Sequence, residues 1–296
     1  MQNTQDHVLD GKMYWYIQGK FKEAKQAFQS AIEQDFKCVD AYSELASLEN
    51  LHENYQSAIR LIDTAIDLNP DYTKAYYFKA SFLLSNKKHH EASKCVRKAE
   101  QLLTLNKDVV EVYLAKSKVF DTLGKKDVAL ECCERVIQYS NEAKNNLYLP
   151  YSLYIKGNIL LQEFPQQALE CYDAILKIND SVAGVHNNRG KALAALEHKH
   201  DAIEAYIKAS DLFRESQYYK YAIECCNRII EIDDSNAQYF LKRSKIFKDF
   251  KSYDNALNDL DKAMTLDKSD QIQDLRQEVV NLKQLTAVND TSLTKG

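Results

Sequence analysis

Alanines recur along this chain at a nearly fixed spacing, and this period constrains the fold more than any other feature of the sequence. The eight alanines are Ala24, Ala58, Ala92, Ala129, Ala168, Ala202, Ala222 and Ala256. Four of the seven intervals between them are 34 residues, and the others are 37, 39 and 20 residues. A repeat of this length is typical of a solenoid, in which short units stack along one axis. We therefore expect extended surfaces that hold other molecules rather than a pocket for chemistry.

Other residues recur together with the alanines. Four and seven residues after the alanine stand further core positions, as in Phe28 and Ala31 or Ile62 and Ala65. These spacings place the side chains on one face of a helix. A small residue stands twelve positions before the alanine in five units: Ala46, Ala80, Ser117, Gly190 and Ser244. Small residues on facing helices let the backbones approach closely, and a larger side chain there costs roughly 1–3 kcal/mol through overpacking.

The combined pattern resembles the tetratricopeptide repeat over about residues 5–267. One unit reads Tyr42-x-x-Leu45-Ala46, then Tyr55-x-x-Ala58-x-x-x-Ile62-x-x-Ala65, then Pro70. The resemblance implies an all-α fold, a right-handed superhelical solenoid of antiparallel helix pairs. A generic helical bundle is the alternative fold, and we disfavour it because a bundle needs heptads rather than a 34-residue motif.

The intervals between alanines also predict how the chain is divided. We expect an N-terminal array of about four repeats at 1–141, a loop or hinge at 142–150, a C-terminal array of three to four repeats at 151–267, a capping helix at 268–286 and a disordered tail at 287–296. The hinge is predicted because Tyr139 to Pro150 is rich in Asn and Lys and lengthens the spacing to 39 residues. The cap is predicted from Ile272, Leu275, Val279 and Leu282 at helical spacing.

The region 183–232 is irregular. The interval from Ala202 to Ala222 is only 20 residues, so one helix at about 200–215 is predicted to serve two repeats. Tyr206 fits both as the core residue after Ala202 and as the first aromatic residue before Ala222. In the preceding repeat the internal turn is one residue short, because Gly157 stands only eleven positions before Ala168.

Composition excludes several classes of function. The net charge is −4 with 28% charged residues and no basic block, which does not favour nucleic-acid binding. No stretch approaches the roughly 20 apolar residues of a membrane span, so we expect no membrane insertion. The segment from Met1 to Lys20 has no apolar run typical of a signal peptide. With an odd number of cysteines, 7, most of them beside core positions, the chain is predicted to be cytoplasmic.

Motifs that carry chemistry are missing from the sequence. There is no phosphate-binding glycine loop, no G-x-S-x-G and no EF-hand spacing. His52-Glu53-Asn54-Tyr55-Gln56 resembles the zinc motif H-E-x-x-H, but the second histidine is absent. The adjacent cysteines do not form C-x-x-C, and we interpret them as small buried apolar residues. We therefore predict no catalytic residues, no metal site and no cofactor.

The resemblance also implies a concave groove lined by the first helix of each repeat. Positions two, five, six, nine and twelve of a repeat usually face this groove. The candidate peptide-binding residues taken from these positions are Tyr77, Lys118, Tyr154, Asn158, Asn187, Asn188, Lys191 and Lys245. Asparagine amides donate and accept hydrogen bonds at once, which suits an extended backbone, and lysines favour an acidic segment. The alternative interpretation of these residues is an ordinary solvated helix face.

Partner and function follow from the groove. Some tetratricopeptide co-chaperones hold the C-terminal tail of heat-shock chaperones with a lysine at the fifth position, where this chain has Ser43, Tyr77, Leu114 and Tyr154. Binding of such a tail is therefore disfavoured. We expect a scaffold or adaptor that binds a protein segment in the groove. The alternative is a structural subunit of a larger assembly that uses its convex face or its ends, and an enzyme is disfavoured.

Overall fold

The computed structural model describes residues 3–17, 20–103, 110–142 and 147–293, and these residues form helices and turns without a strand. The predicted all-α fold is confirmed. The chain divides into two compact units, unit 1 at Met1–Ser181 and unit 2 at Val182–Gly296, and each is described by itself.

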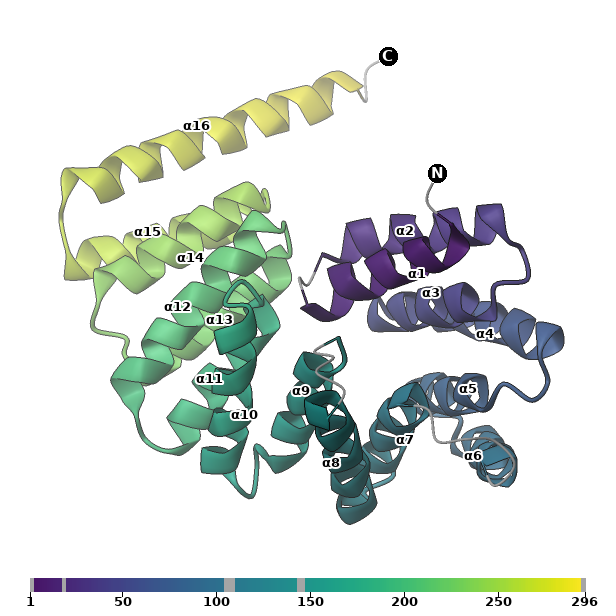
Figure 1. Ribbon diagram of the computed structural model, residues 1–296. Coiled ribbons are helices and arrows are strands. Elements are labelled where there is room, and N and C mark those ends of the chain that lie inside the picture. The colour runs from purple at the N-terminus through teal and green to yellow at the C-terminus, as the bar shows by residue number, and fades with distance from the viewer. Residues whose placement is uncertain (1–2, 18–19, 104–109, 143–146, 294–296) are drawn as a thin grey trace. The chain divides into compact units, whose positions relative to one another are not determined.

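Unit 1 is a stack of antiparallel helix pairs, shown from purple to teal in Figure 1. Its helices are α1 (Thr4–Lys12), α2 (Phe21–Gln34), α3 (Val39–Leu51), α4 (Tyr55–Leu68), α5 (Thr73–Ser85), α6 (His89–Leu103), α7 (Val110–Thr122), α8 (Lys126–Glu142), α9 (Leu149–Leu160) and α10 (Pro165–Ile178). A short π-helix, η1 (Met13–Ile17), extends α1. Each odd-numbered helix packs on the next helix, and α3, α5, α7 and α9 also pack on one another in sequence.

Unit 2 contains, in its described part, α11 (Ala183–Ala195), α12 (Lys199–Glu215), α13 (Tyr219–Ile232), α14 (Ala237–Asp249), α15 (Tyr253–Leu266) and α16 (Asp270–Leu293). Helix α12 packs on α11 and also on α13, as predicted for a helix of 200–215 that serves two repeats. The phenol ring of Tyr206 lies against Gly190 of α11, and Ser210 on the same helix lies 3.3 Å from Cys226 of α13. One helix therefore completes two consecutive units.

The recurring positions form the core, as the spacing predicts. All eight spaced alanines are buried, and so are the small residues that precede them by twelve positions. Where that residue is glycine, an aromatic ring occupies the space: Gly157 faces Tyr172 and Gly190 faces Tyr206. Stacking buries faces that short helices of about a dozen residues cannot bury alone.

Two kinds of turn join the helices. Inside most repeats, a residue with positive φ ends the first helix: Glu53, Lys87, Gly124, Glu197, Gln217 and Lys251. The α9–α10 turn is one residue shorter, as predicted, and residues 161–164 contain no positive φ. Between repeats, an Asp or Asn side chain accepts a hydrogen bond from the backbone N–H two residues later, at Asp35, Asn69, Asn179, Asp233 and Asp267. This local bond ends the second helix and turns the chain into the next unit.

The ends of the predicted divisions differ from the compact units. Helices α8 and α9 flank the expected loop at 142–150 and pack on each other, with Ser152 Oγ donating to the Cys133 carbonyl at 3.0 Å. The division lies instead between Ser181 and Val182. Residues 143–146 of that loop are outside the described residues, and a hinge there stays a prediction. Helix α16 runs to Leu293, so it continues seven residues beyond the expected cap into the segment predicted as a tail.

Candidate binding surfaces

A buried charge cluster lies on the first helices of unit 1. The Lys74 ammonium lies 2.6 Å from Glu44 Oε1 and 3.7 Å from Asp40 Oδ1, and Lys12 Nζ lies 3.8 Å from the same Glu44 oxygen. The side chain of Glu44 is fully buried, and those of Lys12 and Lys74 are nearly so. The Tyr72 hydroxyl donates to Asp40. Two cations and two carboxylates therefore neutralise one another on the side of unit 1 where the groove was expected.

The first repeat also contacts helix α9. Lys12 Nζ donates to the Tyr148 hydroxyl at 3.2 Å, across 136 residues of sequence. The ring centroids of Trp15 and Tyr151 lie 6.4 Å apart, and η1 packs on α9. The inner row of helices in unit 1 thus meets its own beginning. Side chains of the protein itself occupy much of this inner side.

The predicted site residues of unit 1 have different environments. The ring of Tyr77 is fully buried, and its hydroxyl has no hydrogen-bond partner among the described residues. Lys118 is half-buried with its ammonium 5.8 Å from the centroid of Tyr151, and Tyr154 is half-buried beside Tyr172. Asn158 is exposed and accepts a hydrogen bond from the Tyr172 hydroxyl at 2.9 Å. A buried ring offers no surface to a ligand, so three of the four remain candidates.

The predicted site residues of unit 2 lie on α11 and α14. Asn187 and Lys191 stand one helical turn apart on α11 and are half-buried, whereas Asn188 is 8% exposed. Asn187 Oδ1 lies 3.5 Å from the Cys225 thiol of α13. Burial raises the pKa of Cys225 to about 12 and Cys226 adds to the rise, while the charge of Lys191 opposes it. Lys245 is half-buried on α14.

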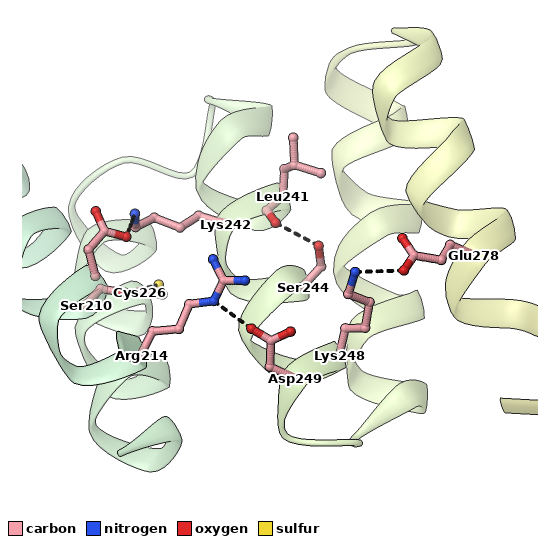
Figure 2. A network of polar contacts seen from close by, with 10 residues as sticks. Ser210, Arg214, Cys226, Leu241, Lys242, Ser244, Lys248, Asp249 and Glu278 are labelled. Carbon is pink, nitrogen blue, oxygen red and sulfur yellow. Dashed lines mark hydrogen bonds and ion pairs between the residues drawn. The ribbon is translucent and has the colours of Figure 1, made fainter. Parts of the chain in front are cut away.

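Ion pairs join α12, α14 and α16 in a ladder that sequence reasoning missed. Figure 2 shows Lys242 paired with a carboxylate of α12, Arg214 with Asp249, and Lys248 with Glu278. The carboxylate is that of Asp211; the Arg214–Asp249 and Lys248–Glu278 distances are 2.6 and 2.9 Å. Each pair joins neighbouring helices of this row. A signal existed in the sequence, since Asp211 and Lys242 stand 31 residues apart, close to one repeat.

The ladder leaves two lysines unpaired. Lys245 stands on α14 between Lys242 and Lys248, yet neither it nor Lys191 has a carboxylate partner in the described part of the chain. Both are flanked by side chains that are already neutralised. These two ammonium groups are therefore the inner-row cations of unit 2 best placed to meet an external anion.

A second tie holds the outer helices of unit 2. Arg243 forms a two-point contact with Asp259 of α15, with nitrogen–oxygen distances of 2.8 and 2.6 Å, and its third nitrogen donates to Asn227 of α13 at 2.7 Å. Asp259 is buried. This arrangement uses the planar fork of arginine to connect α13, α14 and α15.

The cysteines and histidines form no cluster of metal-ligating type within the residues that the structure describes. Burial raises the pKa of Cys132 to about 11 and that of Cys133 to about 12. A thiol with a raised pKa is a poor nucleophile and a poor metal ligand at neutral pH. This agrees with the interpretation of these side chains as core residues.

Comparison with known proteins identifies the repeats. Two family models, both described as tetratricopeptide repeat, match residues 52–95 and 110–142. The peroxisomal targeting signal receptor of Candida albicans is 24% identical over 232 residues, 70% of this chain and 36% of the receptor. A TPR repeat-containing protein of Methanocaldococcus jannaschii is 23% identical over 277 residues, 90% of this chain and 45% of that protein. The chain thus spans less than half the length of either relative.

Solved structures share the fold at low sequence identity. The human IFIT1 dimer with PPP-AAAA aligns with a TM-score of 0.55 and 14% identity, covering 90% of this chain and 73% of that one. The APC/C hetero-tetramer Cut9-Hcn1 aligns with a TM-score of 0.58 and 13% identity, covering 93% and 55%. At these identities the likeness establishes the solenoid fold alone.

The surfaces, the repeats and the comparisons agree with one another. No helix in the described ranges is long and apolar enough to cross a bilayer. Stacked repeats of this kind serve generally as protein-interaction scaffolds. The pattern of alanines and small residues, the stacked helix pairs and the two matching models together show that this chain belongs to the tetratricopeptide repeat family.

Proposed function

We propose that this protein is a cytoplasmic scaffold whose unit 2 binds an extended, acidic segment of a partner protein through Asn187, Lys191 and Lys245. The observation that carries the proposal is the pairing pattern of the lysines. Lys242 and Lys248 are neutralised by neighbouring helices, whereas Lys191 and Lys245 have no carboxylate partner among the described residues. Half-buried cations without a partner attract an anion from outside more strongly than fully solvated ones.

Asparagine adds the contact that a peptide backbone needs. The Asn187 amide accepts from Cys225 with its oxygen, which leaves its two N–H donors for carbonyl groups of a bound segment. In unit 1, Lys118, Tyr154 and Asn158 supply a second set of the same chemical type. The names of the relatives point to protein partners as well, since one of them is a receptor for a targeting signal.

The test compares variants on an array of short peptides of graded charge. The triple variant Asn187→Ala, Lys191→Ala, Lys245→Ala is expected to lose binding to acidic peptides, roughly tenfold for each charged hydrogen bond removed. The matched control is Lys220→Ala, Lys262→Ala, which removes exposed lysines from α13 and α15. Binding should also weaken with added salt. Equal binding by the triple variant and the control, with intact helicity, would contradict the proposal.

A structural subunit that uses its edge is the second candidate function. An aromatic cluster at the α12–α13 and α14–α15 turns favours it: the rings of Phe213 and Tyr221 stack at 5.3 Å, and Tyr219 lies 5.9 Å from Phe250. Tyr221 is 53% exposed and Phe250 is 44% exposed. Exposed aromatic clusters are enriched at protein interfaces. The variant Tyr221→Ala, Phe250→Ala loses the partner in this case, while the triple variant keeps it.

A further inference from the structure

The first repeat closes the inner side of unit 1. Lys12 reaches Glu44 on α3 and Tyr148 on α9, and Trp15 reaches Tyr151 on α9. The contacts to α9 join the beginning of the unit to a helix four pairs later. We call α1 and η1 with these contacts the clasp.

The ammonium of Lys12 is held more loosely than its neighbour. It lies 3.8 Å from Glu44 Oε1, whereas the Lys74 ammonium lies 2.6 Å from the same oxygen. Together with Asp40, the four charges sum to zero. When Lys12 leaves, the remaining group of Glu44, Asp40 and Lys74 carries one net negative charge, and a buried carboxylate loses part of its compensation. The vacated position therefore favours another monocation over an empty or neutral group.

Few apolar contacts anchor the clasp. Within α1 only Val8, Gly11 and Lys12 are buried, while Leu9 and Met13 are exposed. The helix is interrupted by the π-turn of η1, a geometry that is less stable than a regular helix. A terminal repeat also has only one neighbour to stack on, so it opens at a lower free energy than an internal repeat.

We infer that the first repeat is a clasp that opens ahead of the rest of unit 1, and that a partner segment bearing a lysine or arginine takes the place of Lys12 beside Glu44. The occupant is specified by charge complementarity, because the chain's own ammonium already fills this position. Opening also uncovers Tyr148 and Tyr151, whose rings and hydroxyls suit a cationic side chain. This inference concerns unit 1 alone, and its tests do not involve the proposed site of unit 2.

The opening is measured through Trp15, the single tryptophan of the chain. Acrylamide quenching of its fluorescence is followed against urea and compared with helix loss by circular dichroism. We expect Trp15 to become accessible at a lower urea concentration than the main loss of helix. Lys12→Ala should lower the Trp15 midpoint further and leave the main transition in place. The matched control Lys25→Ala removes an exposed ion pair to Glu49 and should move neither. Coincident transitions in the wild-type chain and in Lys12→Ala would overturn the inference.

The cation position is tested by chemical rescue. n-Propylammonium chloride, which replaces the atoms lost in Lys12→Ala, should restore the Trp15 midpoint of that variant, with sodium chloride at equal ionic strength as the reference. Adding Glu44→Gln or, as a milder change at a more exposed residue, Asp40→Asn should weaken the rescue. The same effect on Lys25→Ala, or no effect beyond that of sodium chloride, would overturn the assignment of a cation position.

Discussion

Gly190 and Tyr206 fit against each other so closely that a Cβ atom at position 190 would lie 2.7 Å from Cε1 of the tyrosine ring. Gly157 and Tyr172 show the same relationship at 2.8 Å, and Gly11 and Phe28 at 2.5 Å. In repeats with alanine at the corresponding position, the partner is smaller, as in Ala46 with Ile62 or Ala80 with Val96. The chain therefore combines glycine with an aromatic ring and alanine with an aliphatic side chain to fill equal space.

This complementarity predicts a rescue. Gly190→Ala should destabilise unit 2 by about 1 kcal/mol or more, because overpacking costs roughly 1–3 kcal/mol and the gain in helix propensity returns only about 1 kcal/mol. Tyr206→Ile alone should cost about 2–4 kcal/mol by leaving a cavity. The double variant restores the alanine–isoleucine pair of the second repeat. Urea unfolding should give a double variant at least 1 kcal/mol more stable than the sum of the two single changes. Simple additivity would show that the two residues do not share one space.

Tyr77 predicts an unusual gain from losing a hydroxyl. Its oxygen is buried without a hydrogen-bond partner among the described residues, and burial raises the pKa of the phenol. Tyr77→Phe should be neutral or should stabilise the protein by up to about 1 kcal/mol, because an unsatisfied polar group is removed. Tyr172→Phe is the matched control, since its hydroxyl donates to Asn158, and it should cost about 1 kcal/mol. A clear loss of stability in Tyr77→Phe would indicate a partner at this hydroxyl.

The fork of Arg243 predicts that lysine cannot replace it. Arg243→Lys keeps the charge but loses the two-point contact to Asp259 and the bond to Asn227, so we expect a loss of about 1–3 kcal/mol. Arg228→Lys alters only exposed pairs on α13 and should change stability by less than about 0.5 kcal/mol. Thermal unfolding of the two variants side by side measures the difference, and equal midpoints would contradict the role of the fork.

The sequence predicted the fold because the repeat uses residues whose size matters. The spaced alanines, the small residues before them and the shared helix at 200–215 were readable, since each position follows from the period alone. The double role of Tyr206 shows this best, because only one helix satisfies both of its neighbours.

The surfaces were less predictable, since the repeat fixes which helix faces inward but not what fills the space in front of it. Tyr77 stands at a groove position, yet its ring is buried. The contact of Lys12 with Tyr148 joins residues 136 positions apart, and no short-range pattern predicts it. The curvature of a stack accumulates over many units, so contacts between distant repeats depend on small angles that single positions do not specify.

Thiol reactivity gives a prediction for the folded state. Burial raises the pKa of Cys132 to about 11, and that of Cys133 and Cys225 to about 12, so at pH 8 about one molecule in a thousand or fewer has the corresponding thiolate. A disulfide reagent should therefore modify the folded chain slowly and begin at Cys95, the one cysteine that is only half-buried. In urea all 7 cysteines should react at once. Rapid modification of Cys133 in the folded protein would show that α8 opens easily.

The internal turns predict a simple route to higher stability. Glu197 ends α11 with a φ of 62°, a conformation that costs an ordinary residue about 1–2 kcal/mol and glycine almost nothing. Glu197→Gly should stabilise unit 2 by about 0.5–1 kcal/mol, after the greater freedom of glycine in the unfolded chain is subtracted. Gly124 already occupies the equivalent position in the α7–α8 turn. Lys208→Gly, at an exposed position inside α12, is the matched control and should cost about 1 kcal/mol. If both substitutions lower the unfolding midpoint, the left-handed conformation of Glu197 is not strained.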